Sequence, residues 1–316
     1  MGPTAAGKTA LAMALADAMP CDLISVDSVL VYREMDIGSA KPDRETLARY
    51  PHQLIDIRDP AEAYSAAEFR EDALKAIQTA VGRGRLPVLV GGTSMYFKAL
   101  CQGIGDLPSA DPAIRRRLEE EALQFGWGAL HQRLQSLDPL AGERIHPANR
   151  QRIQRALEVI ELSGRPISSF WQSGEGGDGE VDWDRPATAD LPFRPLAFAV
   201  DPGERQVLHH RIAARFREML DQGLIEEVRR LHERGDLSPE LPSIRAVGYR
   251  QVWEYLEGKY DRAMLFEKGC AATRQLARRQ LTWLRSWPEV TWISGGDKVS
   301  EGVLQLREHI VSIANK

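Results

Sequence analysis

The sequence opens with a glycine-rich loop (residues 2–9, GPTAAGKT) whose residue types and spacing suit binding of a phosphate group. It matches G-x-x-x-x-G-K-[ST] at every fixed position. Backbone N–H groups of such a loop converge on an anion, and the following helix adds the positive end of its dipole. Lys8 would neutralise phosphate oxygens, and the Thr9 hydroxyl would bind Mg²⁺. The pattern predicts a diphosphate site rather than a glycine-rich turn with a chance lysine, formed by Gly2, Pro3, Thr4, Ala5, Ala6, Gly7, Lys8 and Thr9.

The acidic residues near this loop do not follow the pattern of a kinase. Kinases and ATPases with such a loop hold magnesium through an Asp at the end of an apolar strand. Here the apolar run at residues 86–90 (LPVLV) is followed by Gly91, Gly92 and Thr93, and the only strand-terminal acid is Asp27. Asp27 could bind the metal, act as a general base or cap a helix. Phosphoryl transfer is therefore not assured, and a small-molecule or nucleotide kinase is kept as the alternative enzyme.

A second group of residues suits binding of RNA. Residues 268–285 carry five basic side chains and no acid, and Trp283 lies among them. Arginines bind RNA phosphates, and aromatic rings stack on unpaired bases. A solvated helix face is the plainer interpretation of such a run. The five basic residues are Lys268, Arg274, Arg278, Arg279 and Arg285.

The composition excludes some classes of protein. The 316 residues include 41 Lys+Arg and 45 Asp+Glu, so a globally basic nucleic-acid coat is excluded, whereas a local basic face is not. Cys21, Cys101 and Cys270 form no C-x-x-C pair and suggest neither a disulfide framework nor a zinc site. No apolar run approaches the ~18 residues of a membrane span, and no signal peptide is recognised. We therefore expect a cytoplasmic enzyme.

The elements that must position these residues alternate between strand and helix over residues 1–107. Helical periodicity covers residues 9–19 and 66–81, and short apolar runs at 23–27, 54–57 and 86–90 predict strands. This alternation predicts a parallel sheet covered by helices. A phosphate loop usually follows a buried strand. Only Met1 precedes Gly2, so a compromised sheet or a lost N-terminal segment is expected here.

Residues 108–190 follow a different pattern, with helices predicted at 111–124, 127–137 and 149–162 and no strand. Asp111 and Pro112 are a typical helix start. Residues 173–190 are rich in glycine and acids and predict a flexible linker. Strands at 195–200 and 290–293, a helix at 207–231 broken at Gly223, and a last helix from about 299 complete the core. The predicted domains are therefore 1–107 with 191–316, and the helical insertion 108–190.

Taken together, these motifs resemble the tRNA dimethylallyltransferases (tRNA isopentenyltransferases) of bacterial type, nearly end to end. The resemblance implies an α/β fold whose core is a P-loop nucleotide-kinase-like parallel sheet, with an all-helical insertion domain. It also implies Mg²⁺-dependent transfer of a dimethylallyl group from its diphosphate to N6 of the adenosine immediately 3′ of the anticodon. One departure is Ala148-Asn149-Arg150, where the family usually has Asn-Asp-Pro. The matching segments are ISVDSVLVYREMDIGSAKP, HQLIDIRDP, YSAAEFR, VLVGGTSMYFKAL, LPSADPAIR, RIHPANRQRIQRALEV, LPSIRAVGYRQ and ATRQLARRQLTWLR.

The resemblance also implies roles for single residues. Asp27 matches the family's general base, and its alternatives are a helix cap or a magnesium ligand. Thr93 matches a threonine that contacts the reacting region, and its alternative is a loop hydroxyl bonded to backbone. Arg215, in HHRIAARF, matches an arginine that binds the diphosphate, with Arg211 as the neighbouring candidate. Either arginine could instead be solvated on an amphipathic helix.

The implied partners are the tRNA anticodon stem-loop and dimethylallyl diphosphate, without a membrane, and the chain is expected to act as a monomer. A target base in a stacked loop must be extruded into a pocket to be modified. A non-catalytic RNA-binding protein is a third class, but it would not need Gly7, Lys8 and Thr9. The expected tRNA-binding residues are Asp27, Ser28, Val29, Leu30, Thr93, Arg115, Gln151, Arg152, Ile153, Gln154, Arg155, Arg245, Ala246, Val247, Gly248, Tyr249, Arg250, Arg278, Arg279, Gln280, Trp283 and Arg285.

Overall fold

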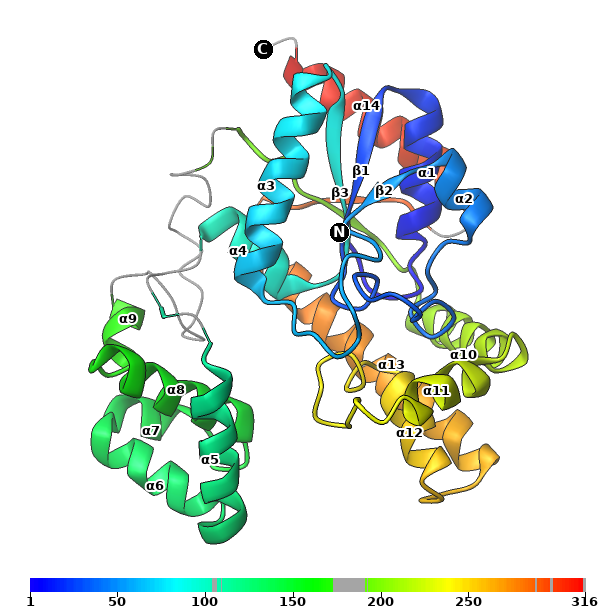
Figure 1. The fold of residues 1–316 in the computed structure, drawn as a ribbon. Coiled ribbons are helices and arrows are strands. Elements are labelled where there is room, and N and C mark those ends of the chain that lie inside the picture. Colours follow the sequence, from blue (N-terminus) through cyan, green and yellow to red (C-terminus); the bar gives the residue numbers. More distant parts are fainter. Residues whose placement is uncertain are drawn as a thin grey trace. The chain divides into compact units, whose positions relative to one another are not determined.

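The structure is a computed structural model that describes residues 1–103, 107–108, 110–172, 191, 193–287, 289–295 and 298–314. It is a mixed α/β fold with parallel strands and many helices (Figure 1). The chain divides into two compact units, Met1–Cys101 with Leu191–Lys316, and Gln102–Asp190. The expected linker at 173–190 lies outside the described residues. No helix in the described ranges is long and apolar enough to cross a membrane.

A three-stranded parallel sheet forms the centre of the first unit. Strand β1 (Cys21–Val26) lies between β2 (His52–Gln53) and β3 (Leu86–Gly91). Val26 pairs with Gly91, so β1 and β3 end at the same level. The residues that follow the two strands therefore leave the sheet side by side.

Helices α1 (Lys8–Ala18) and α3 (Ala66–Gly82) both pack on β1 and β3. Ser65 and Glu68 form a capping box that fixes the start of α3, and Phe69 and Ile77 on its apolar face are buried, as the periodicity predicts. Two shorter helices, α2 (Arg44–Arg49) and α4 (Ser94–Gln102), follow β1 and β3 in the chain.

A second parallel pair joins β4 (Phe198–Val200) to β5 (Thr291–Ile293). Met1 extends beside β4, because Val200 N donates to Met1 O at 2.9 Å and Met1 N donates to Phe198 O at 2.7 Å. The residue in front of the glycine-rich loop is thus already in strand-like pairing. Helix α14 (Val299–Ala314) packs on α1 and completes this side of the core.

The prediction of a strand at residues 54–57 is wrong. The strand here is the two-residue β2, and the chain turns immediately after it. Leu54 and Asp56 have φ angles of 64° and 56°, in the left-handed region, which an extended strand cannot contain. The apolar residues Leu54 and Ile57 suggest a strand by composition, but they belong to a turn.

Four helices gather beyond the carboxyl ends of β1 and β3 (Figure 1). They are α10 (Arg205–Asp221), α11 (Leu224–Glu233), α12 (Tyr249–Leu256) and α13 (Arg262–Arg285). Gly223 separates α10 from α11 with φ 102°, which confirms the predicted break. These helices bring Arg215 and residues 268–285 into the same unit as the glycine-rich loop.

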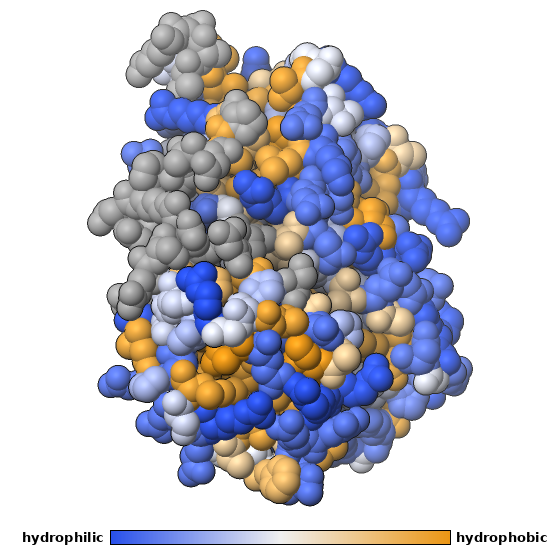
Figure 2. Space-filling model, turned by 60° about the vertical axis from the view of Figure 1, so that its left-hand side comes forward, coloured by the Kyte–Doolittle hydropathy of each residue, from blue (hydrophilic) through white to orange (hydrophobic). Residues whose placement is uncertain are grey.

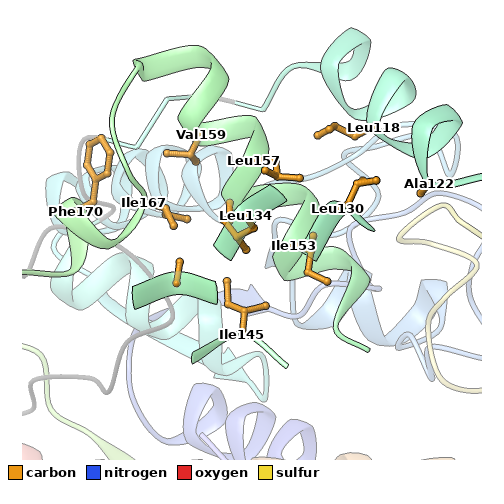
Figure 3. Packing of buried hydrophobic residues seen from close by; sticks show 12 residues of the cluster. Leu118, Ala122, Leu130, Leu134, Ile145, Ile153, Leu157, Val159, Ile167 and Phe170 are labelled. Atoms are coloured by element: carbon orange, nitrogen blue, oxygen red, sulfur yellow. The ribbon is translucent and has the colours of Figure 1, made fainter. Parts of the chain in front are cut away.

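The described part of the second unit is all helical: α5 (Pro112–Phe125), α6 (Trp127–Leu137), α7 (Pro139–Arg144), α8 (Arg150–Ser163) and α9 (Ser168–Gln172). Asp111 caps α5 by accepting hydrogen bonds from Ala113 N and Ile114 N, as expected for an Asp-Pro start. Figure 3 shows the apolar core of this unit, in which Leu118, Leu134 and Leu157 are fully buried.

Apolar side chains are scattered among hydrophilic ones on the surface drawn in Figure 2. The most exposed large apolar side chains are Leu123 (89%) and Phe125 (63%), both in the last turn of α5. The three cysteines are buried free thiols. Burial raises the pKa of the Cys101 thiol to about 11, so it is protonated and unreactive at neutral pH.

Candidate active site

The glycine-rich loop presents backbone N–H groups at the start of α1. Gly7 precedes the helix with φ 88°, and Ala5 also has a left-handed φ of 61°. Among the described residues, no side chain caps α1, and the first turn of the helix contains no acidic residue. An uncapped helix start with a positive dipole end is suited to an external anion. Thr9 is exposed in this first turn, where its hydroxyl can reach a ligand bound to the loop.

Lys8 closes over the loop. Its Nζ donates to Pro3 O at 2.7 Å, and the side chain is half-buried. Burial lowers the pKa of Lys8 to about 8; nearby Asp27 raises it, and nearby Arg215 lowers it further. The ammonium is therefore held in a place that disfavours its charge until an anion arrives.

Asp27 follows β1 directly, and its carboxylate is half-buried. Oδ1 accepts hydrogen bonds from Val29 N at 2.8 Å and from Leu30 N at 3.3 Å. These bonds are the local capping role that the sequence left open. They use one carboxylate oxygen, so Oδ2 is left for a further partner.

Thr93 lies beside Asp27 because β1 and β3 end together. Thr93 Oγ1 accepts a hydrogen bond from Ser28 N at 3.1 Å, and Thr93 N donates to Val26 O at 3.3 Å. The loop hydroxyl is thus bonded to backbone, yet that bond also holds it next to Asp27. Ser28 is exposed, so this edge of the sheet is open to a large substrate.

Arg215 lies on α10 and supplies a second cation. Burial lowers the pKa of Arg215, and the charge of Asp27 opposes that shift. Among the residues that the structure describes, its guanidinium has no hydrogen bond or ion pair, whereas Arg211 Nη1 donates to Pro202 O at 3.5 Å. Arg215 is thus the arginine that shares an electrostatic cluster with Lys8 and Asp27.

The expected RNA-binding residues of the first unit divide into exposed and buried ones. Arg245, Arg250, Arg278, Arg279 and Arg285 are exposed. Arg250 Nε donates to Glu254 at 3.3 Å, while no ion pair within the described residues involves Arg278, Arg279 or Arg285.

Tyr249 does not fit the expected role of a stacking platform, whereas Trp283 is half-buried and stays a prediction. Tyr249 is fully buried and donates its hydroxyl to Glu227 Oε1 at 2.7 Å. Trp283 packs against Phe97 of α4, with ring centroids 6.1 Å apart, and against Trp287 at 4.8 Å. Both rings hold helices together.

Glu227 is a buried structural carboxylate that the sequence did not reveal. Its buried carboxylate accepts hydrogen bonds from Asp36 N (3.0 Å), Ile37 N (2.7 Å) and Gly38 N (3.1 Å), besides that of Tyr249. It thereby anchors the segment that follows Asp27 to α11 and α12. Glu226 and Glu227 are adjacent, and the sequence does not reveal which of them is buried. In the structure Glu226 is exposed and Glu227 is buried.

The expected RNA-binding residues of the second unit surround a buried carboxylate. Glu158 is fully buried and accepts hydrogen bonds from Arg115 Nε at 2.8 Å, Arg155 Nη1 at 2.6 Å and Asp111 N at 2.8 Å. Arg115 and Arg155 are therefore engaged within the unit, although each is partly exposed.

The remaining expected residues on α8 differ in exposure. Ile153 is fully buried in the core of the second unit, so it cannot contact RNA (Figure 3). Gln154 Nε2 donates to Arg115 O at 3.1 Å, whereas Gln151 and Arg152 are exposed. Within the described ranges, no group of three or more His, Cys, Asp or Glu could hold a metal ion on its own.

Comparison with known proteins identifies the family of the chain. The family model described as IPP transferase matches residues 30–287. A tRNA dimethylallyltransferase 2 from Hahella chejuensis is 62% identical over 298 residues, which cover 94% of this chain and 90% of the relative.

Solved structures are similar over almost the whole length. A full-length tRNA isopentenylpyrophosphate transferase from Bacillus halodurans is 36% identical, with a TM-score of 0.68 over 98% of this chain and 94% of that chain. A eukaryotic dimethylallyltransferase acting on tRNA shares the fold, with a TM-score of 0.78 at 23% identity, over 100% of this chain and 78% of that one. The extent of the family match and the identity to the Hahella protein show that this chain belongs to the IPP transferase family.

Proposed function

We propose that this chain transfers the dimethylallyl group of dimethylallyl diphosphate to N6 of the adenosine immediately 3′ of the anticodon in tRNA, giving N6-dimethylallyladenosine and diphosphate. One observation carries the assignment: in a chain of this family, Lys8 of the glycine-rich loop, Arg215 and Asp27 interact electrostatically, and Thr93 is bonded to the residue after Asp27. A leaving diphosphate and a proton-accepting carboxylate are thereby placed within one site.

The donor half of this site is the glycine-rich loop, acting as the phosphate loop of a nucleotide-kinase-like core. Negative charge builds on the diphosphate as the bond from C1 of the dimethylallyl group to oxygen breaks. The N–H groups at the start of α1, with Lys8 and Arg215, stabilise that charge. Their cationic groups are partly buried, which strengthens each interaction with the anion.

The acceptor half is Asp27 with Thr93. N6 of adenine is a weak nucleophile because its lone pair is delocalised into the ring. As N6 bonds to C1, it must lose a proton, and the carboxylate of Asp27 accepts it. Oδ1 is occupied by the amides of Val29 and Leu30, so Oδ2 is the accepting atom. Thr93 holds the backbone of Ser28 and so keeps Asp27 in place.

A magnesium ion fits this donor set. The Thr9 hydroxyl is exposed in the first turn of α1, and oxygen ligands are those that Mg²⁺ prefers. Thr9 together with diphosphate oxygens would hold the ion, and Asp27 Oδ2 is an alternative oxygen ligand. The ion would add positive charge against the leaving diphosphate.

The tRNA is bound by exposed cations in both units. In the first unit these are Arg278, Arg279 and Arg285 on α13, with Arg245 and Arg250 before and on α12. In the second unit, residues 108–190, the exposed Gln151 and Arg152 begin α8, and we assign this unit to the anticodon stem-loop. These arginines bind phosphates of the tRNA backbone, and the target adenine is extruded from the anticodon loop into the site.

The assignment is tested by incubating the protein and Mg²⁺ with radiolabelled dimethylallyl diphosphate and unmodified tRNA. Label is expected in the tRNA, and not in a tRNA whose adenosine 3′ of the anticodon is replaced by guanosine. A parallel reaction with ATP separates the kinase alternative. Formation of ADP in step with product, or label that is independent of that adenosine, would contradict the proposal.

A further inference from the structure

The side chain of Gln280 joins two parts of the site that are far apart in sequence. Gln280 lies in the last two turns of α13. Its Oε1 accepts a hydrogen bond from Thr4 N at 2.9 Å, and its Nε2 donates to Gly92 O at 2.9 Å. If the amide were flipped, Nε2 would face the donor Thr4 N and Oε1 would face the acceptor Gly92 O. Only the observed orientation therefore satisfies both contacts.

A side chain on Gly92 would displace the amide of Gln280. A Cβ placed there would overlap Gln280 Nε2 and would lie 3.0 Å from Gly2 O. The start of the glycine-rich loop, the end of β3 and α13 therefore meet at one point. Gly92 provides the space that this meeting requires.

The same helix makes two further contacts with the site. Ala5, which has a left-handed φ, packs against the cluster that includes Ala277 of α13. Gln280 lies about one turn after Ala277 and accepts a hydrogen bond from Thr4 N, next to Ala5 in the loop. About one turn further on, Trp283 packs on Phe97 of α4. The conformation of the glycine-rich loop is therefore maintained by α13 and not by the loop alone.

We propose that Gln280 is a positioning residue that fixes the distance between the diphosphate-binding loop and the Asp27–Thr93 pair. Its Oε1 holds Thr4 on the donor side, while its Nε2 holds Gly92, the residue before Thr93, on the acceptor side. This inference rests on the proposed function. It differs from the tRNA-binding role expected from the sequence, because the side-chain amide points to backbone groups of the site.

The energetic reason is the sensitivity of displacement reactions to distance. Attack on C1 requires the nucleophile and the leaving group in line, and a misplacement of about 1 Å can reduce the rate ~10²-fold. The donor is held by the loop, whereas the acceptor is held beside Thr93. Gln280 is the side chain hydrogen-bonded to both segments.

The test compares Gln280→Ala, Gln280→Glu and Gly92→Ala with the matched control Gln275→Ala, an exposed glutamine on the same helix. Alanine is a strong helix former, so α13 is preserved. Single-turnover rates at saturating donor and tRNA are expected to fall ~10²-fold in Gln280→Ala and at least ~10-fold in Gly92→Ala. In Gln280→Glu, a carboxylate oxygen faces Gly92 O, so a loss as large as that of Gln280→Ala is expected. tRNA affinity should stay within about twofold, and Gln275→Ala should match the wild type.

A double-mutant cycle separates positioning from a general structural effect. The added methyl of Gly92→Ala acts mainly by displacing Gln280, so Gly92→Ala with Gln280→Ala should be no slower than Gln280→Ala alone. Additive losses would overturn the proposal. A normal saturated rate in Gln280→Ala, with either weaker tRNA binding or only a lower melting temperature, would overturn it equally.

Amide hydrogen exchange of the donor-free protein tests the contact without catalysis. Exchange in residues 2–9 should be faster in Gln280→Ala and Gly92→Ala than in the wild type and in Gln275→Ala. Failure of the wild type to modify tRNA would contradict the proposed function. In that case unchanged exchange in Gln280→Ala would also overturn the positioning role, while faster exchange would support it.

Discussion

Thr93 Oγ1 accepts a hydrogen bond of 3.1 Å from Ser28 N, and this bond connects the residues that follow two neighbouring parallel strands. Asp27 lies on one side of the bond, and Gly92 lies on the other. The Thr93 hydroxyl could therefore contact the substrate directly, or it could hold Ser28 and thereby keep Asp27 in position. The two roles respond differently to substitution.

Thr93→Val keeps the shape of the side chain but removes the acceptor for Ser28 N. We expect a loss in kcat of about tenfold, because Asp27 loses its support, with the donor KM nearly unchanged. Thr93→Ser keeps the hydroxyl and should retain most of the activity. Steady-state kinetics with both substrates provide the measurement. Equal losses in the Val and Ser variants would argue against the hydrogen bond as the cause.

Lys8 predicts a pH dependence of donor binding. Its pKa is lowered to about 8 by burial, and a bound diphosphate raises that pKa again because an anion favours the ammonium. The bound state thus holds more protons above about pH 8, so affinity should fall as the pH rises through this value. Calorimetry with inorganic diphosphate, in buffers of different ionisation enthalpy, measures the proton uptake.

The matched control is Lys8→Met, which leaves the ionisation of the diphosphate itself unchanged. Proton uptake near pH 8.5, after subtraction of the control, should be positive in the wild type. Equal uptake in the two proteins would place the titrating group elsewhere.

The exposed arginines of α13 predict a salt-dependent tRNA affinity. Replacement of Arg278 or Arg279 by Gln should weaken binding, and each should reduce the slope of log K against log salt by about 0.7–0.9. Arg229→Gln is the control, because Arg229 is exposed but pairs with Glu226 at 3.1 Å. Filter-binding titrations over a salt series give the slopes. If Arg278→Gln keeps the wild-type slope, this face of α13 is only a solvated helix.

The burial and the hydrogen bonds of Glu158 predict that the stability of the second unit decreases at acidic pH. Its burial acts to raise its pKa, but hydrogen bonds from Arg115, Arg155 and Asp111 N outweigh burial and hold the pKa below the ordinary value. Stability from this carboxylate is therefore fully present above the unfolded pKa of about 4.5 and is lost as the pH falls through the lower folded pKa.

We expect Glu158→Ala to destabilise the second unit by about 3 kcal/mol at neutral pH, since two arginines lose a buried partner. The difference from the wild type should shrink below about pH 4.5. Amide exchange in α5 and α8 under increasing urea measures the effect, with the exposed Glu120→Ala as control. A deficit that does not change with pH would show that packing, and not charge, is responsible.

Much of the fold follows from local sequence patterns. Helices α5, α6 and α8, the cap at Asp111 and the break at Gly223 are local features, and periodicity or turn chemistry predicts them. The short helices α7 and α9 were not predicted. The glycine-rich loop is predicted for the same reason. The turn at residues 54–57 is missed because left-handed Leu54 and Asp56 have no local signal.

The contacts that organise the site could not be predicted in this way. Gln280 and Thr4 are 276 positions apart, and Glu227 and Asp36 are 191 apart. Periodicity assigns Gln280 and Glu227 to helices, but it does not reveal which backbone groups they meet after folding. Tyr249 was expected to stack on RNA because aromatic type does not reveal burial.

Asp27 is proposed to accept the N6 proton. Asp27→Asn keeps the hydrogen bonds to Val29 N and Leu30 N but cannot accept that proton. The most direct measurement is the single-turnover rate of Asp27→Asn with saturating tRNA and dimethylallyl diphosphate over a magnesium titration. If Asp27 is the general base, the rate should be ~10²–10⁴ lower at every magnesium concentration, with tRNA affinity preserved. Recovery of the rate at high magnesium would make Asp27 a metal ligand, and near-wild-type rates throughout would reduce it to a cap. Either result would contradict its role as the general base.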